Sequence, residues 1–452
     1  AAAAADDDAD VDLVIETATS ESIPGTDTES IPDTDTEEMA DVSLAVDVDV
    51  APKFVDPPLP PECDLQQVDR KFRHTIKYRN STHSGWWSDG CRQWGLEGEW
   101  KRRPDRRIYY AFPFGGELEI LHITLEEIYP EVDFIILLEA TVTWRGDPKP
   151  VVFPKLNQST NARYWDKIRY IRYSFEDPVM ADRLSRCMTE RVSGAKPVGA
   201  TECRWLRQWG ARDHLVTKGA YDIRDNDVFL IADLDELVSR RFLRALKHCY
   251  IWPDDPKVKV ADSKCSRAGV HTFGHKYHFG CTINKNYGHF HPDLSLGRCL
   301  PTFGGEELRR FWGVNKKYFR KPAPALLEDP KYIGPAGWHM HGFLSNSQVL
   351  WKWFSRSGSE LNSKGTWTQK DLDEIKDKRR LCNEAKGFLP FDALGCEPLP
   401  ALVANNPQDW QHVINYVDDV ERPDPFGVEQ WYRDELIKRR DPNDPYKGEI
   451  QW

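Results

Sequence analysis

Apolar and polar positions alternate between strand-like and helix-like periods from about residue 107 onward. Residues 107–112 are rich in aromatic and branched side chains, which predicts a strand. Residues 117–129 carry leucine and isoleucine at helical spacing and stop before Pro130. Residues 132–138 and 228–232 are nearly continuous apolar runs, which is typical of strands covered on both faces.

The alternation of strand-like and helix-like patterns continues along the chain. A further strand is expected at 168–173, and helices are expected at 202–218, 240–249, 346–354 and 369–386. Strands that alternate with helices predict an α/β fold with a mostly parallel central sheet flanked by helices. Ligands of such sheets bind at the carboxyl ends of the strands. From residue 418 onward, Pro-rich charged stretches predict a wrapping or loose tail.

Charge divides the 452-residue chain unequally. Residues 1–62 carry 12 Asp and 6 Glu against one basic residue, Lys53, and end in a Pro-rich stretch. Such a segment buries too little apolar area to offset its ordering entropy, so we expect a disordered acidic stem; a specific binding tail is the alternative. The remaining residues have a net charge of +6 without a concentrated basic patch, which does not favour nucleic acid as a partner.

Cysteines and sequons favour the secretory route. The ten cysteines include no C-x-x-C pair, and their even number suits an oxidising compartment. Pairing cannot be deduced from spacing, although Cys382 with Cys396, or Cys265 with Cys281, would close local loops. Asn80 and Asn157 lie in N-glycosylation sequons.

Several histidines between residues 271 and 291 invite a zinc interpretation. Intervening glycines break any single helix there, and no H-E-x-x-H motif is present. We therefore expect these histidines in aromatic strands near an acceptor pocket rather than in a metal site: His271, His275, His278, His289 and His291.

The clearest chemical signal is a group of acids directly after the apolar run 228–232. Asp233, Asp235 and Glu236 would repel one another beside a buried strand, and a hard divalent cation would offset that cost. The D-x-D spacing places Asp233 and Asp235 on one side of an extended segment. One would hold a metal, and the other a ribose or a metal-bound water. Alternatively, Asp235 and Glu236 only enrich the first turn of a following helix.

A set of motifs in consistent order resembles glycosyltransferase family 17, which includes the enzyme that adds bisecting N-acetylglucosamine to N-glycans. The matching segments are FPFGGEL at 112–118, 132–139, TWRGDPKP at 143–150, Arg212-Asp213, DNDVFLIADLDE at 225–236, AGWH at 336–339 and 355–362. The sequence differs from the family at Gly116, where the family has Asn, at Gly358, where it has His, and after His339, where some relatives carry a Cys.

The resemblance implies a GT-A-like nucleotide-diphospho-sugar transferase fold and a UDP-N-acetylglucosamine donor. It also implies a divalent cation, manganese or magnesium, and inverting β1,4 transfer to a mannose of an N-glycan or glycoprotein. We expect a stem at 1–62, an N-terminal extension at 63–105, the catalytic domain at 106–400 and a C-terminal extension at 401–452. The location expected is the Golgi or secretory lumen, as a type II membrane protein whose anchor lies outside this sequence.

Roles for individual residues follow from the resemblance and the inverting reaction. Asp233 and Asp235 are the expected metal ligands, and they bind the donor together with Glu236. Glu360 is the preferred catalytic base, with Asp213 second. His339 would bind diphosphate or metal. Further donor-site candidates are Arg212, which alternatively forms a salt bridge, and Trp338, Glu117 and Glu139.

Other interpretations of the same residues remain open. A transferase of the same fold would use another donor or acceptor. A glycosidase would use two carboxylates without metal or nucleotide. Loss of catalysis would leave a carbohydrate-binding protein, which the departures at Gly116 and Gly358 keep open. Trp351 and Trp353 would stack on sugars or, as is commoner for Trp, pack in the core.

Overall fold

A computed structural model describes twelve parts of the chain. They are residues 106–156, 160–176, 178–189, 200–249, 265, 267–270, 272–281, 291–309, 336–355, 365–382, 399–417 and 426–452. The expected stem, the N-terminal extension, both sequons (Asn80 and Asn157) and Glu360 lie outside them. Within these parts, no helix combines the length and apolar character that crossing a membrane requires.

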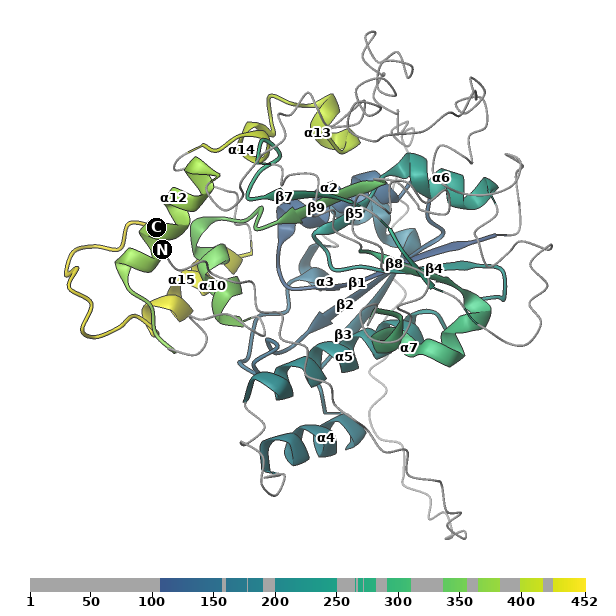
Figure 1. The fold of residues 1–452 in the computed structure, drawn as a ribbon, viewed down its shortest axis with the longest axis horizontal. Coiled ribbons are helices and arrows are strands. Elements are labelled where there is room, and N and C mark those ends of the chain that lie inside the picture. Colours follow the sequence, from purple (N-terminus) through teal and green to yellow (C-terminus); the bar gives the residue numbers. More distant parts are fainter. Residues whose placement is uncertain are drawn as a thin grey trace, which may run out of the picture. The chain divides into compact units, whose positions relative to one another are not determined.

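A six-stranded sheet forms the centre of the described fold, in the order β3-β2-β1-β4-β8-β6 (Figure 1). Its first four strands are parallel, β8 runs antiparallel to β4, and β6 runs antiparallel to β8. The bounds are β1 Ile108–Phe114, β2 Phe134–Ala140, β3 Ile168–Tyr173, β4 Val228–Ile231, β6 Arg267–Gly269 and β8 Asp293–Leu296. The predicted α/β class with a mostly parallel central sheet is therefore confirmed.

Successive strand residues face two separate cores. Tyr110 and Phe112 of β1 belong to one core, which α2 (Leu118–Ile128) and α6 (Arg240–His248) also enter. Tyr109 and Ala111 belong to the other, shared with α5 (Ala200–Gly219) and α7 (Leu300–Arg309). Helix α4 (Pro178–Thr189) packs on α5. Both faces of the sheet are covered, which explains why β2 and β4 are continuous apolar runs.

A second sheet of three short strands, in the order β5-β9-β7, adjoins the first core. Strand β9 (Gly337–His341) pairs antiparallel with β5 (Glu236–Val238) and parallel with β7 (Phe273–Lys276). In the turn after β7, Cys281 forms a disulfide with Cys382, which follows α12 (Gln369–Leu381).

The disulfides differ from the local loops that the sequence suggested. Cys265 pairs with Cys299 rather than Cys281, and Cys382 pairs with Cys281 rather than Cys396. The fold brings residues 101 positions apart within bridging distance, with the Cα atoms of Cys281 and Cys382 separated by 5.7 Å. Helix α12 ends earlier than expected because Cys382 adopts a left-handed conformation, with φ of 51°.

The described C-terminal residues 426–452 pack against the first core, so of the two expectations, a wrapping or a loose tail, the loose tail is wrong. Helix α15 (Val428–Ile437) buries Val428, Tyr432 and Leu436 in the first core. The buried indole of Trp367 donates to the Leu436 carbonyl at 2.6 Å. The remaining helices are α3 Phe153–Leu156, η2 Thr160–Lys167, η4 Gly297–Cys299, α10 Asn346–Ser355, α13 Ala401–Asn405 and α14 Gln411–Ile414.

Ion pairs and hydrogen bonds around Asp227 join the amino ends of β1 and β4. The buried carboxylate of Asp227 accepts bonds from the backbone N–H and Nε of Arg107, both at 2.9 Å, and from the backbone N–H of Arg224 at 2.9 Å. Burial alone would raise the pKa of Asp227, but these hydrogen bonds outweigh it and lower the pKa. The carboxylate therefore favours the folded state only while it is ionised.

We expect Asp227→Asn to lower the free energy of unfolding at pH 7 by about 3 kcal/mol, because two guanidinium groups lose their buried anion. The folded pKa lies below the ordinary value of 3.8, so this contribution exists above about pH 4 and is lost as the pH falls further. Urea unfolding at pH 7 and pH 3 measures it: the difference from wild type should shrink in acid. Asp182→Asn, in an exposed pair on α4, is the control; equal losses in both variants would contradict the assignment.

Candidate functional site

The D-x-D residues lie at the carboxyl edge of the large sheet, in a tight turn rather than an extended segment. Strand β4 ends at Ile231, and the backbone N–H of Glu236 donates to the Asp233 carbonyl at 2.9 Å. Glu236 then begins β5, so the alternative of a helix starting here is also wrong. As a result, the side chains of Asp233 and Asp235 have different partners.

Asp233 lies between two arginines. Its carboxylate is 3.0 Å from an Nη atom of Arg212 on α5 and 3.2 Å from one of Arg309 at the end of α7. The side chain of Asp233 is nevertheless 33% exposed, so one part of it remains open to a ligand. The salt bridge proposed as the alternative for Arg212 is present.

Arg309 is the central cation of this edge. Its buried guanidinium contacts Asp233 and Glu236 from the turn and Asp293 from β8, the last at 3.3 Å. Asp293 is itself 2.5 Å from Nδ1 of His291. Burial would lower the pKa of Arg309, but the carboxylates, Glu236 first, outweigh it and raise the pKa above its usual value. The guanidinium is therefore permanently charged.

Asp235 points toward a different group of side chains. Its carboxylate is 2.8 Å from Nζ of Lys352 on α10, and a ligand atom each from Asp235, His339 and His341 lie within 4.8 Å of one another. Burial would raise the pKa of Asp235, but Lys352 and then His339 outweigh it and lower the pKa. Asp235 is thus a carboxylate, the form that ligates metals.

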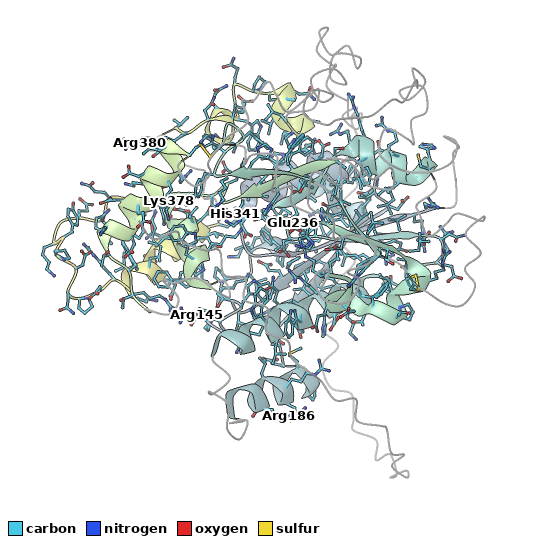
Figure 2. The ribbon with its side chains drawn as sticks, viewed as in Figure 1. Arg145, Arg186, Glu236, His341, Lys378 and Arg380 are labelled. Carbon is cyan, nitrogen blue, oxygen red and sulfur yellow. A yellow bond between two sulfur atoms is a disulfide. The ribbon has the colours of Figure 1, made fainter. Side chains whose placement is uncertain are left out.

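Strand pairing creates this cluster. Glu236 lies opposite His339 across β5 and β9, and the N–H of Met340 donates to the Asp235 carbonyl at 2.6 Å. Because side chains alternate along β9, His339 and His341 share one face while Trp338 and Met340 are buried on the other. Figure 2 shows Glu236 and His341 in the interior, whereas Arg186 and Arg380 lie at the periphery.

The ligand atoms suit a divalent cation of intermediate hardness. A carboxylate oxygen with two imidazole nitrogens fits Mn²⁺ better than Mg²⁺, which prefers oxygen alone. The structure places Asp235 in this group but not Asp233, although the sequence predicted both as metal ligands. His341 was missed; its signal was the His-x-His alternation on a strand. Arg309 and Lys352 were also missed, and no local pattern marks either.

Two other residues predicted for the site accept hydrogen bonds from backbone N–H groups of the protein itself. Glu139, at the end of β2, is fully buried and accepts from the N–H groups of Val152 at 2.9 Å and Phe153 at 3.0 Å. Asp213 on α5 accepts from the N–H groups of Gly305 and Glu306, each at 2.9 Å. Both acids therefore hold loop or helix backbone in place.

The last two residues predicted for the donor site are Glu117 and Trp338. Glu117 follows the carboxyl end of β1, where its carboxylate accepts from the Gly115 N–H at 2.9 Å and attracts Lys352. Trp338 is buried in the first core, next to the cluster but not exposed to it.

Gly116, where the family has Asn, has a structural explanation. Its φ is +116°, and a Cβ there would lie 2.8 Å from the hydroxyl oxygen of Tyr432. That hydroxyl donates to the Gly115 carbonyl at 2.9 Å. A side chain at position 116 would therefore strain the backbone and push the Tyr432 hydroxyl away from the Gly115 carbonyl.

The C-terminal helices also hold α10, which carries Lys352. Ser345 donates to Glu429 of α15 at 2.7 Å, and the Trp351 ring packs 5.1 Å from Trp431. Trp351 is buried, so it belongs to the core, whereas Trp353 is half-buried beside Lys378. The position of Lys352 thus depends on α15.

Arg309→Met should lower the free energy of unfolding by about 3–5 kcal/mol, because three carboxylates lose their shared cation in a buried place. Arg309→Lys keeps the charge and should recover part of this loss. Denaturant unfolding of both variants measures the effect. Arg380→Met, in an exposed pair on α12, is the matched control and should change stability by less than about 1 kcal/mol. Equal stability of Arg309→Met and the control would contradict the central role of Arg309.

Comparison with known proteins finds a similarity to one protein family. Residues 66–262 match the model of glycosyltransferase family 17. This segment contains Glu117, Arg212 and the D-x-D turn and ends before His339. No curated protein matches the chain.

Two solved structures show low similarity. One is a mannosyltransferase from Pyrobaculum calidifontis in complex with GDP-Man and Mn²⁺, with 11% identity, coverage of 83% of this chain and 97% of its own, and a TM-score of 0.25. The other is mouse xyloside xylosyltransferase 1 in its apo form, with 9% identity, 53% and 86% coverage, and a TM-score of 0.20. The family match, in contrast, agrees with the motifs and with the fold. Residues 66–262, less than half of the chain, are therefore similar to glycosyltransferase family 17, and this similarity supports glycosyl transfer as the activity.

Proposed function

We propose that the protein transfers N-acetylglucosamine from UDP-N-acetylglucosamine to a mannose of an N-glycan, in β1,4 linkage and with inversion. The observation that carries the proposal is the group of Asp235, His339 and His341 beside the D-x-D turn, at the carboxyl edge of a family 17 sheet. The choice of donor and acceptor rests on the family resemblance.

Asp235, His339 and His341 would hold a divalent cation, with manganese preferred over magnesium. When bound, the cation neutralises charge on the departing diphosphate. Asp233 is a third exposed and fixed by Arg212 and Arg309, so it is positioned to accept a hydrogen bond from the donor. Glu236 shapes the turn through its bond from the Asp233 N–H, at 2.7 Å.

The base that accepts the proton of the acceptor hydroxyl is, in this proposal, Glu360. The backbone bonds of Asp213 favour Glu360 as the base, because a carboxylate that accepts two backbone N–H bonds is costly to move. A single displacement then needs the carboxylate of Glu360 on the side of the sugar opposite to the diphosphate.

We further propose that the protein works in the Golgi or secretory lumen as a type II membrane protein. The disulfides Cys265–Cys299 and Cys281–Cys382 support an oxidising compartment. The acidic residues 1–62 would then separate the catalytic part from the membrane anchor.

Asp235→Asn and His339→Ala should each lower Mn²⁺-dependent release of UDP from UDP-N-acetylglucosamine by at least about 100-fold, as should EDTA. His412→Ala, in a pair with Glu119 at 2.7 Å, is the control and should keep wild-type activity. Full activity in EDTA would refute the metal site. Absence of nucleotide-sugar binding would favour a carbohydrate-binding protein, and cleavage of glycosides without nucleotide would favour a glycosidase.

Glu360→Gln should retain UDP-N-acetylglucosamine binding and lose transfer by about 10²–10⁴-fold, because the amide cannot accept the proton. Binding by calorimetry and transfer to a mannose-terminated N-glycan measure the two effects, and NMR of the product reports the linkage. Asp213→Asn should instead lower thermal stability. Transfer by Glu360→Gln at the wild-type rate would exclude Glu360 as the base.

A further inference from the structure

Lys352 lies where a bound cation would compete with it. Its ammonium is 2.8 Å from the Asp235 carboxylate, the same carboxylate that lies within 4.8 Å of the His339 and His341 ligand atoms. The side chain of Asp235 is only 10% exposed, so few directions of approach to it are open. A divalent ion and an ammonium in contact with one buried carboxylate would repel each other strongly.

Lys352 has acidic neighbours other than Asp235 that attract its ammonium group. Lys352 is attracted by Glu117 and Asp233 as well as by Asp235, and its side chain is 27% exposed. These acids lie after β1 and β4, at the edge of the sheet where ligands of parallel sheets bind. Its helix is fixed through Ser345 and Trp351, so only the flexible side chain needs to move.

We propose that Lys352 is the resident counter-cation of Asp235, which a divalent metal must displace and which then contacts the diphosphate of the nucleotide. This inference rests on the proposed function, because it assigns a metal to Asp235. Displacement of Lys352 lowers the affinity of the free enzyme for metal. A diphosphate that accepts the ammonium removes this cost, so nucleotide and metal strengthen each other's binding by the same factor.

Titration of Mn²⁺ into the full chain, followed by electron paramagnetic resonance with and without UDP, tests the proposal without any measurement of turnover. Without UDP, Lys352→Met should bind Mn²⁺ about tenfold more tightly than wild type, and UDP should then add less to that affinity. Lys352→Arg keeps the competing charge and should resemble wild type. Lys438→Met, which removes an exposed charge on the surface, should also resemble wild type.

The possible failures are distinguishable. If wild type binds Mn²⁺ and Lys352→Met binds it equally or more weakly, Lys352 does not compete and the inference is overturned, while the metal site stands. If neither protein binds Mn²⁺ with or without UDP, and Asp235→Asn leaves the resonance signal unchanged, the proposed metal site fails. The inference then fails with it. Should Lys352→Met not fold, Lys352→Gln, which also removes the charge but keeps a polar end, gives the same comparison.

Discussion

The buried guanidinium of Arg309 is the interaction on which the candidate site depends. Asp233, Glu236 and Asp293 come from two separate segments, and their negative charges would not remain together in a buried place without a cation. Arg309 holds them at the edge of the sheet from the end of α7. Its bond to Glu236 fixes the start of β5, and its bond to Asp233 fixes the start of the D-x-D turn. The direction of the chain after β4 is set by these contacts.

Once the turn is fixed, β5 determines which distant residues reach it. Strand β9 pairs with β5 so that Glu236 faces His339, and the alternation along β9 directs His339 and His341 to the side of Asp235. The matched family segment ends at residue 262, so these two histidines and Lys352 come from the part of the chain beyond it. The candidate metal ligands are therefore a product of the small sheet as much as of the D-x-D motif.

The sequence predicted those features that local physics determines. The apolar runs of β2 and β4 must be covered on both faces, so they indicate a central sheet, and acids after such a strand indicate its ligand-binding edge. Asp235 was predicted in this way, whereas His339 was predicted from the resemblance of AGWH at 336–339 to family 17. Arg309 and Lys352 were not, because an arginine or lysine on a helix has no local signature and gains its role only from the carboxylate that tertiary packing places beside it. Glu139 is the opposite case, because the sequence predicted a role in donor binding that the fold does not support. An acid near a strand end can bind a ligand or accept hydrogen bonds from backbone N–H groups, and only the fold shows that Glu139 does the latter.

The last helix takes part in the same arrangement. Tyr432 of α15 occupies the space where a side chain at position 116 would lie, and it donates to the carbonyl next to that position. Glu429, one turn earlier, binds the serines at the start of α10, which carries Lys352. A change in α15 would therefore shift both the loop after β1 and the lysine beside Asp235. Glycine at 116 is then a consequence of how α15 packs, and it requires no loss of catalysis to explain it.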